Sequence, residues 1–281
     1  MLKFTKMHGI GNDYVYFDCT KEDIENPGAL SIELSDRHFG VGSDGVILIR
    51  SSKIADFKMS MFNADGSEGK MCGNGIRCVG KFAYDKGLTD KAKLEIETLD
   101  GIKYLDLFVK DGKVETVRVN MGKAVLKGKD IPTTFDMDKV VNEALVVDGV
   151  SHEVTCVSMG NPHCILFVDK EINLLDLNLE KIGPGFENHS VFPDRVNTEF
   201  IKVIDDKTLE MRVWERGSGE TWACGTGACA SVVAAVLNGF CKANEEVAVK
   251  LRGGDLKIKY MDDGTVYMEG SATTVFEGVI E

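Results

Sequence analysis

Apolar side chains recur at every second position in two segments of the chain, residues 57–63 and 209–215. This period of two is typical of a β-strand with one buried face. The two segments are 209 − 57 = 152 residues apart, and each ends at a turn rich in glycine and serine, at Gly66-Ser67 and Gly217-Ser218-Gly219. The pattern therefore predicts a strand followed by a turn at two matching places.

The same motif, Cys-Gly-x-Gly, follows each turn, at Cys72 and again at Cys224. Beyond it the apolar positions take a helical spacing, and each predicted helix is closed by a glycine, Gly87 or Gly239. We therefore predict that each cysteine lies at or near a helix N-terminus, where unpaired backbone N–H groups and a partial positive charge favour a thiolate and can bind a carboxylate.

Further landmarks repeat in the same order. Gly11-Asn12 and its apolar run match Gly160-Asn161, a shift of 161 − 12 = 149, and Asp36-Arg37 matches Asp194-Arg195. Each match alone is short enough to arise by chance. Together they favour an internal duplication over a short-period repeat.

Short alternating strands separated by Asp-Gly or Gly-Gly turns fill residues 92–121 and 247–267. The sequence predicts an α/β (α+β) fold of two similar domains, each a curved, mostly antiparallel, barrel-like sheet around a central helix. The expected domains are residues 1–121 plus 275–281, and residues 122–274. The closing segment, residues 275–280, is predicted to return and pair with the first half.

Composition excludes several classes of protein. The 281 residues suffice for two cores, and 43% hydrophobic and 28% charged residues are ordinary for a globular protein. A net charge of −12 without a basic stripe argues against nucleic-acid binding. With no signal peptide or membrane span visible, we expect a cytoplasmic protein whose eight cysteines are reduced.

One glycine-based alternative fails on its context, and one cysteine-based alternative is disfavoured by its spacing. The segment from Gly40 to Gly45 matches G-x-G-x-x-G, but residues 46–49 read as a strand where a dinucleotide fingerprint needs a helix. A metal site made by Cys72, Cys78, Cys224 and Cys229 has spacings unlike those of zinc sites. We interpret Cys78 and Cys229, like Cys19, Cys156, Cys164 and Cys241, as packing residues.

One thiolate and one thiol on opposite faces of a carbon can invert its configuration, because the second group delivers a proton from the side opposite to the departing one. A cysteine with an ordinary pKa of about 8.5 needs only a modest shift to supply thiolate near neutral pH. Helix-start amides could hold the substrate carboxylate and its developing enolate charge. No lysine motif for pyridoxal phosphate is evident, and no cofactor or metal is expected.

Five motifs closely resemble those of the diaminopimelate epimerases, and the resemblance spans nearly the whole chain. They are Gly11-Asn12-Asp13, the seven residues from Met71 to Arg77, the four from Gly160 to His163, the four from Asp194 to Asn197, and the thirteen from Glu215 to Gly227.

The resemblance implies a cofactor-independent epimerase that interconverts LL- and meso-2,6-diaminopimelate, a precursor of lysine and of the cell wall, with its site in the cleft between the domains of a homodimer. It implies Cys224 as proton acceptor and Cys72 as proton donor from LL to meso, with His163 and Glu215 tuning the thiols. The implied substrate-binding residues are Asn12, Asn63, Gly73, Asn74, Asn161, Asn197, Glu215, Arg216, Gly225 and Thr226. Some members carry a glutamine where this chain has Gly45.

Two other functions stay open on the sequence. A proline or hydroxyproline racemase of the same fold would not need Glu215 and Arg216 to hold a second amino-acid end, a task that suits the planar guanidinium of Arg216. A thiol redox sensor or metal-binding protein would use the cysteines without turnover. The small-molecule amino-acid epimerase is the interpretation that uses all five motifs.

Overall fold

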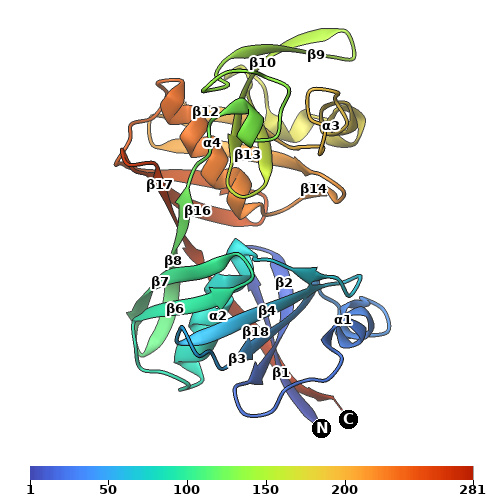
Figure 1. Ribbon diagram of the computed structural model, residues 1–281, viewed down its shortest axis with the longest axis vertical. Helices are drawn as coiled ribbons and strands as arrows, with labels where there is room; N and C mark the ends of the chain where they lie inside the picture. The colour runs from blue at the N-terminus through green and yellow to red at the C-terminus, as the bar shows by residue number, and fades with distance from the viewer. Residues whose placement is uncertain (281) are drawn as a thin grey trace. The chain divides into compact units, whose positions relative to one another are not determined.

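The computed structural model describes residues 1–280, which divide into two compact units. Unit 1 comprises residues 1–120 together with the C-terminal segment from Glu269, and unit 2 comprises residues 121–268. Each unit is a curved sheet packed against a long central helix (Figure 1). The expected α/β fold of two similar domains is confirmed, except that the sheets are curved without closing into barrels over the described residues.

Unit 1 holds eleven elements, one of which, β8, runs on into unit 2. They are β1 (Leu2–Gly9), β2 (Asn12–Cys19), α1 (Pro27–Ser35), β3 (Gly45–Arg50), β4 (Phe57–Asn63), β5 (Glu68–Gly69), α2 (Gly73–Asp85), β6 (Lys93–Thr98), β7 (Gly101–Lys110), β8 (Lys113–Lys123) and β18 (Thr273–Ile280).

Unit 2 holds the remaining elements, and its last strand, β17, ends in unit 1. They are η1 (Gly128–Asp130), β9 (Glu143–Val147), β10 (Val150–Ser158), β11 (Pro162–Phe167), η2 (Leu174–Asp176), α3 (Leu179–Glu187), β12 (Asn197–Asp205), β13 (Thr208–Glu215), β14 (Gly219–Thr221), α4 (Gly225–Leu237), β15 (Glu246–Leu251), β16 (Gly254–Tyr260) and β17 (Thr265–Ser271).

The two sheets repeat one pattern of strand pairing. In unit 1 the strands run β1-β2-β3-β4-β6-β7, with parallel pairs only at β2/β3 and β4/β6. In unit 2 the order β10-β11-β12-β13-β15-β16 has its parallel pairs at the matching places, β11/β12 and β13/β15. The shared order of parallel and antiparallel pairs confirms the duplication predicted from the sequence.

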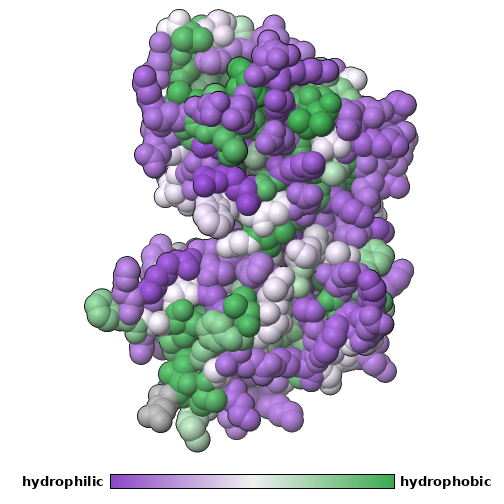
Figure 2. Space-filling model, turned by 180° about the vertical axis from the view of Figure 1, so that it is seen from behind, coloured by the Kyte–Doolittle hydropathy of each residue, from purple (hydrophilic) through white to green (hydrophobic). Residues whose placement is uncertain are grey.

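The C-terminal strand β18 pairs antiparallel with β1, from Leu2 opposite Ile280 to His8 opposite Thr273. This confirms that the closing segment returns to the first half. The side chains of Val275, Phe276 and Val279 on β18 are each about half exposed, and Figure 2 shows an apolar area beside the end of this strand. The edge of unit 1 therefore carries apolar surface.

The two central helices have the same length and the same ends. Each contains 13 residues, begins directly after a cysteine, and is followed by a glycine with left-handed backbone, Gly87 (φ 75°) or Gly239 (φ 77°). The last turn of each helix closes onto that glycine, since a left-handed residue after the C-cap costs glycine no steric strain. Helix α4 is apolar on nearly all sides and buried, as expected for a helix covered by a sheet.

Candidate functional site

Cys72 and Cys224 are the N-cap residues of α2 and α4. Both have extended backbone (φ −130° and −117°), and each sulfur accepts a hydrogen bond at 3.3 Å from the third helical amide, that of Gly75 or Gly227. The predicted position of both cysteines at a helix N-terminus is confirmed. A thiolate at either place would be held by amides that have no partner within the helix.

Burial opposes that ionisation at both thiols. Burial raises the pKa of Cys72, while hydrogen bonds from the amides of Gly75 and Asn74 and from the Tyr14 hydroxyl lower it in part. Burial also raises the pKa of Cys224, which is only 4% exposed. The groups that surround each sulfur therefore decide which one ionises.

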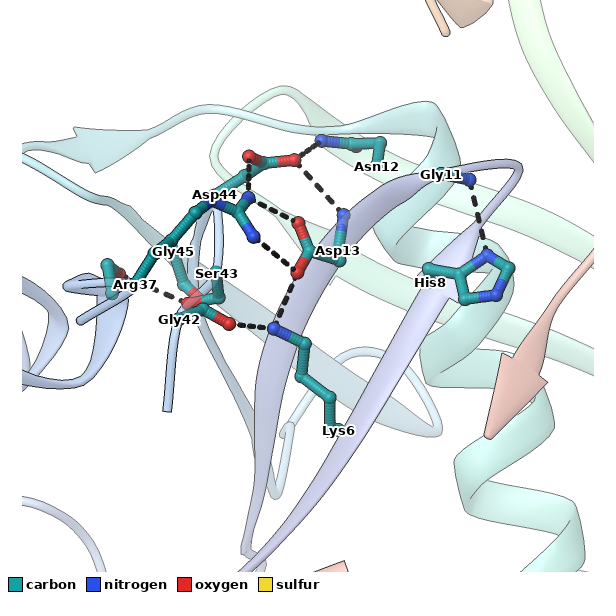
Figure 3. Close-up of polar contacts among 11 residues, drawn as sticks. Lys6, His8, Gly11, Asn12, Asp13, Arg37, Gly42, Ser43, Asp44 and Gly45 are labelled. Atoms are coloured by element: carbon teal, nitrogen blue, oxygen red, sulfur yellow. Dashed lines mark hydrogen bonds and ion pairs between the residues drawn. The ribbon is translucent and has the colours of Figure 1, made fainter. Parts of the chain in front are cut away.

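One contact of Cys72 favours its protonated form. The thiol donates a hydrogen bond to Oδ1 of Asn12 over 3.2 Å. The amide group of Asn12 is held in that orientation because its Nδ2 donates to the Asp44 carboxylate over 2.7 Å (Figure 3). An oriented acceptor stabilises a thiol and does nothing for a thiolate.

An outer network fixes Asp44 in turn (Figure 3). Its carboxylate accepts from the Asp13 amide over 3.1 Å and pairs with the Arg37 guanidinium over 2.9 Å, and Arg37 also pairs with Asp13 over 2.8 Å. Lys6 completes the network by bonding Asp13 and the carbonyl oxygen of Gly42. Although burial acts to raise it, hydrogen bonds from Arg37 and Lys6 lower the pKa of Asp13 overall, whereas burial raises that of Asp44.

Position 45 has no room for a side chain. A Cβ added to Gly45 would lie 2.1 Å from the backbone oxygen of Phe62 on the neighbouring strand β4. A glutamine, as some diaminopimelate epimerases carry here, does not fit this backbone. In this chain the polar groups at the turn are instead Asp44 and Arg37 (Figure 3).

The surroundings of Cys224 are of a different kind. His163 lies on β11 and Glu199 on the adjacent strand β12, both fully buried, and their side chains meet at 2.7 Å between Nδ1 and Oε1. The other ring nitrogen, Nε2, lies 3.0 Å from Oδ1 of Asn161. The Thr226 hydroxyl lies 3.6 Å from the Cys224 sulfur.

Glu215, at the end of β13, is the second carboxyl group near this thiol. It accepts a hydrogen bond from the Thr221 hydroxyl, and burial raises its pKa, while hydrogen bonds from Thr221 and Cys224 act to lower it. Negative charge on Glu215 or Glu199 raises the pKa of Cys224 further.

The structure groups the sequence-predicted site residues by unit. In unit 1, Asn12, Gly73 and Asn74 lie at the start of α2 with Cys72, and Asn63 ends β4, where its Nδ2 bonds the Ser67 hydroxyl.

In unit 2, Asn161 with His163, and Glu215 with Gly225 and Thr226, lie around Cys224. Asn197 and Arg216 lie together, since Oδ1 of Asn197 accepts from the Arg216 amide over 2.9 Å. The Arg216 guanidinium bonds the exposed backbone oxygen of Asp194.

Four polar residues of the site were not predicted. Tyr14 and Glu199 lie beside the thiols, and Asp44 and Thr221 are bonded to Asn12 and Glu215. Glu199 lies two residues beyond Asn197 in β12, and side chains two apart on a strand share a face. A sequence signal for Glu199 is therefore its place beside Asn197 on one strand, which could have been used if that strand had been predicted.

All eight cysteines are free in the structure, and the six interpreted as packing residues are buried. His163, Glu199 and Cys224 offer atoms within 4.8 Å of one another, close enough to surround a metal ion. In the structure the His163 Nδ1 and the Cys224 sulfur take part in hydrogen bonds with Glu199 and the Gly227 amide. Within residues 1–280, no helix is long and apolar enough to cross a membrane.

Comparisons with known proteins agree with this geometry. Residues 4–127 and 155–275 match the family model for diaminopimelate epimerase. The diaminopimelate epimerases of Methanococcus maripaludis (strain C5) and Acetivibrio thermocellus are each 54% identical over the whole of this chain, covering 100% and 99% of those proteins.

Solved structures show the same fold at low identity. A PhzF-family protein from Bacillus anthracis aligns over 100% of this chain and 99% of its own, with a TM-score of 0.70 and 18% identity. A probable proline racemase from Agrobacterium radiobacter K84 aligns over 100% and 93%, with a TM-score of 0.69 and 12% identity. Full-length identity above one half, together with the family model, identifies the chain as a member of the diaminopimelate epimerase family.

Proposed function

We propose that this protein epimerises LL-2,6-diaminopimelate to meso-2,6-diaminopimelate, with Cys224 and Cys72 acting on one α-carbon from opposite faces. The observation that supports this most strongly is the pair of matched helix starts, each capped by a cysteine whose sulfur accepts an amide hydrogen bond at 3.3 Å. The choice of diaminopimelate as substrate is supported by two relatives, each 54% identical, that are named diaminopimelate epimerase.

The proton balance is simple. The Cys224 thiolate takes the α-proton from one face, and the Cys72 thiol delivers a proton to the other, which leaves a Cys224 thiol and a Cys72 thiolate. Proton exchange then restores the starting pair. The hydrogen bond from Cys72 to Asn12 supports this assignment, since it favours the thiol on the donor side.

The helix-start amides supply the electrostatic part of the reaction. Gly73 and Asn74 begin α2, and Gly225 and Thr226 begin α4, so that their N–H groups point out of the helix end. They would hold the substrate carboxylate, on which charge accumulates as the α-proton leaves. Asn12, Asn63, Asn161, Asn197, Glu215 and Arg216 would hold the remaining amino and carboxylate groups.

The experiment is incubation with LL-diaminopimelate in D2O without added cofactor, followed by chiral separation and mass analysis. We expect meso product with deuterium at one α-carbon, and a fall of at least about 10³-fold in Cys72→Ala and Cys224→Ala. Cys78→Ala and Cys229→Ala, which change buried cysteines further along the same helices, are the matched controls and should stay active. Activity on proline or hydroxyproline with none on diaminopimelate would overturn the proposal, and so would near-full turnover in either N-cap variant.

We also propose that the protein is a homodimer, supported by the half-exposed Val275, Phe276 and Val279 on β18. A patch of this kind on a globular protein commonly marks an interface. Sedimentation equilibrium should give twice the 30.8 kDa of one chain, and a concentration-independent monomer would contradict it.

A further inference from the structure

A buried histidine–carboxyl pair adjoins only one of the two thiols. His163 and Glu199 have fully buried side chains, and Oε2 of Glu199 has no hydrogen-bond partner among the described residues. The His163 ring, the Glu199 carboxyl and the Cys224 sulfur have atoms within 4.8 Å of one another. The sequence motifs that marked the site do not include Glu199.

The contacts of the ring determine how many protons the pair holds. Nδ1 of His163 faces an oxygen of Glu199 at 2.7 Å, and Nε2 faces the amide oxygen of Asn161 at 3.0 Å. The Asn161 oxygen is an acceptor, so Nε2 carries a proton, and the short contact between Nδ1 and Glu199 needs a second proton between the two atoms. The pair therefore carries two protons and no net charge, and in the proposal below the shared proton is on the ring, which gives an imidazolium beside a carboxylate.

The charged groups around Cys224 support a neutral His163–Glu199 pair. The ionisable groups that face Cys224 are Glu199, Glu215 and His163, from β12, β13 and β11. A bare Glu199 carboxylate would place a second negative charge next to Glu215 in a buried site, at a cost of several kcal/mol. An imidazolium at His163, 2.7 Å from Glu199, offsets that cost.

Strand register identifies the residue of unit 1 that corresponds to Glu199 in unit 2. Val15 on β2 pairs with Val46 on β3, and Cys164 on β11 pairs with Thr198 on β12. Val15 and Cys164 are separated by the same 149 residues as the repeated Gly-Asn motif. The residue after Val46, which is Ile47, is therefore the counterpart of Glu199.

Contacts below the helices agree with this equivalence. A Cβ added to Gly75 would meet Cδ1 of Ile47 at 2.7 Å, and one added to Gly227 would meet Oε1 of Glu199 at 2.5 Å. Both side chains thus lie beneath the third residue of a central helix. Since Ile47 fills this place in unit 1, the fold itself does not require a carboxyl group there.

We propose that Glu199 is a positioning residue that holds His163 as an imidazolium beside Cys224, so that the Cys224 thiolate forms next to a positive charge. This inference rests on the function proposed above and gives it a direction, since it makes Cys224 the thiol that ionises first. In this proposal Glu199 acts through His163 and not directly on the substrate.

The test is the Glu199→Gln variant, which keeps the shape of the side chain and removes its charge. Without the carboxylate His163 is neutral, so the Cys224 thiolate loses its counter-charge. We expect alkylation of Cys224 by iodoacetamide at pH 7 to slow by about tenfold, and its pH midpoint to move upward. Peptide mass spectrometry measures the alkylation of Cys72 in the same sample as the internal control, and the alkylation rate of Cys72 should not change.

The opposite result has a clear meaning. If Glu199 were an uncompensated anion, Glu199→Gln would speed the alkylation of Cys224, and the proposal would be wrong. An unchanged rate would also overturn it.

A second measurement needs no variant. The ¹⁵N shifts of His163 in the unaltered protein, assigned through the backbone resonances of that residue, should show both ring nitrogens protonated. A single protonated nitrogen, as expected if the Asn161 amide were turned with its NH₂ toward the ring, would contradict the proton count. Neither measurement uses diaminopimelate, so failure here is distinct from failure of the epimerase assay.

Discussion

Unit 1 and unit 2 present a cysteine on the same helix end but surround it with opposite chemistry. In unit 1 the thiol donates to Asn12, which Asp44 orients, and Ile47 lies beneath the helix. In unit 2 a buried histidine–carboxyl pair replaces that arrangement. The duplicated backbone gives both sulfurs the same amide hydrogen bond, and we propose that a few side chains make one thiol the acid and the other the base.

Replacing the glycine at the third position of each central helix by alanine should give the largest difference in activity loss between the two units. In Gly227→Ala the new Cβ would lie 2.5 Å from Oε1 of Glu199 and 3.1 Å from the Cys224 sulfur, so the carboxyl group that holds His163 must move. We expect kcat/KM to fall by roughly 10²-fold, the typical cost of a small misplacement in an active site.

The matched change Gly75→Ala meets only apolar atoms. They are the terminal methyl of Ile47 at 2.7 Å, which can rotate away, Cε of Met59 at 3.3 Å and Cβ of Cys72 at 3.4 Å. The loss of activity in Gly75→Ala should stay below about tenfold, because no polar contact is displaced. Thermal unfolding of both variants is the control, since alanine within a helix is favoured over glycine by about 1 kcal/mol. Equal losses of activity in the two variants would show that the side chains beneath the helices do not distinguish the units.

Local signals explain why the helices and strands around the cysteines could be predicted. Alternation identified β4 and β13, and Gly87 and Gly239 ended the helices where the backbone turns left-handed. Pairing of β18 with β1 could be predicted because one strand was left after the second repeat.

The neighbours of the thiols were harder to predict, because they come from adjacent strands. Glu199 reaches Cys224 from β12, 25 positions earlier, and Tyr14 lies 58 positions before Cys72. Strand register fixes these contacts, and register depends on tertiary packing. The sequence also did not predict that the curved sheets stay open instead of closing into barrels, because closure depends on the twist accumulated over many strands and not on a local motif.

Removal of the Asp44 carboxylate should change the other thiol. In Asp44→Ala the Asn12 amide loses the partner that turns its oxygen toward Cys72, and a negative charge near the thiol disappears. Both changes favour thiolate, so alkylation of Cys72 should become about 3- to 10-fold faster, the equivalent of one lost hydrogen bond. Alkylation of Cys224 is the control, and a slower reaction at Cys72 would contradict the role given to Asn12.

The smallest effect is expected from Arg37→Ala, which removes the outer part of the unit 1 network. The Arg37 side chain is 57% exposed, and Asp13 keeps its ion pair with Lys6, so the loss of stability at pH 7 should be below about 1 kcal/mol. The folded-state pKa of Asp13 is lowered, so its contribution is present above the unfolded pKa of about 3.9 and is lost as the pH falls through the lower folded value. Urea unfolding at pH 7 and at about pH 2 should therefore show that the difference in unfolding free energy between wild type and variant is smaller at the lower pH. A difference that widened toward the lower pH would show that Arg37 stabilises the fold through a group other than Asp13, and the network in Figure 3 would then not be what holds Asn12 in place.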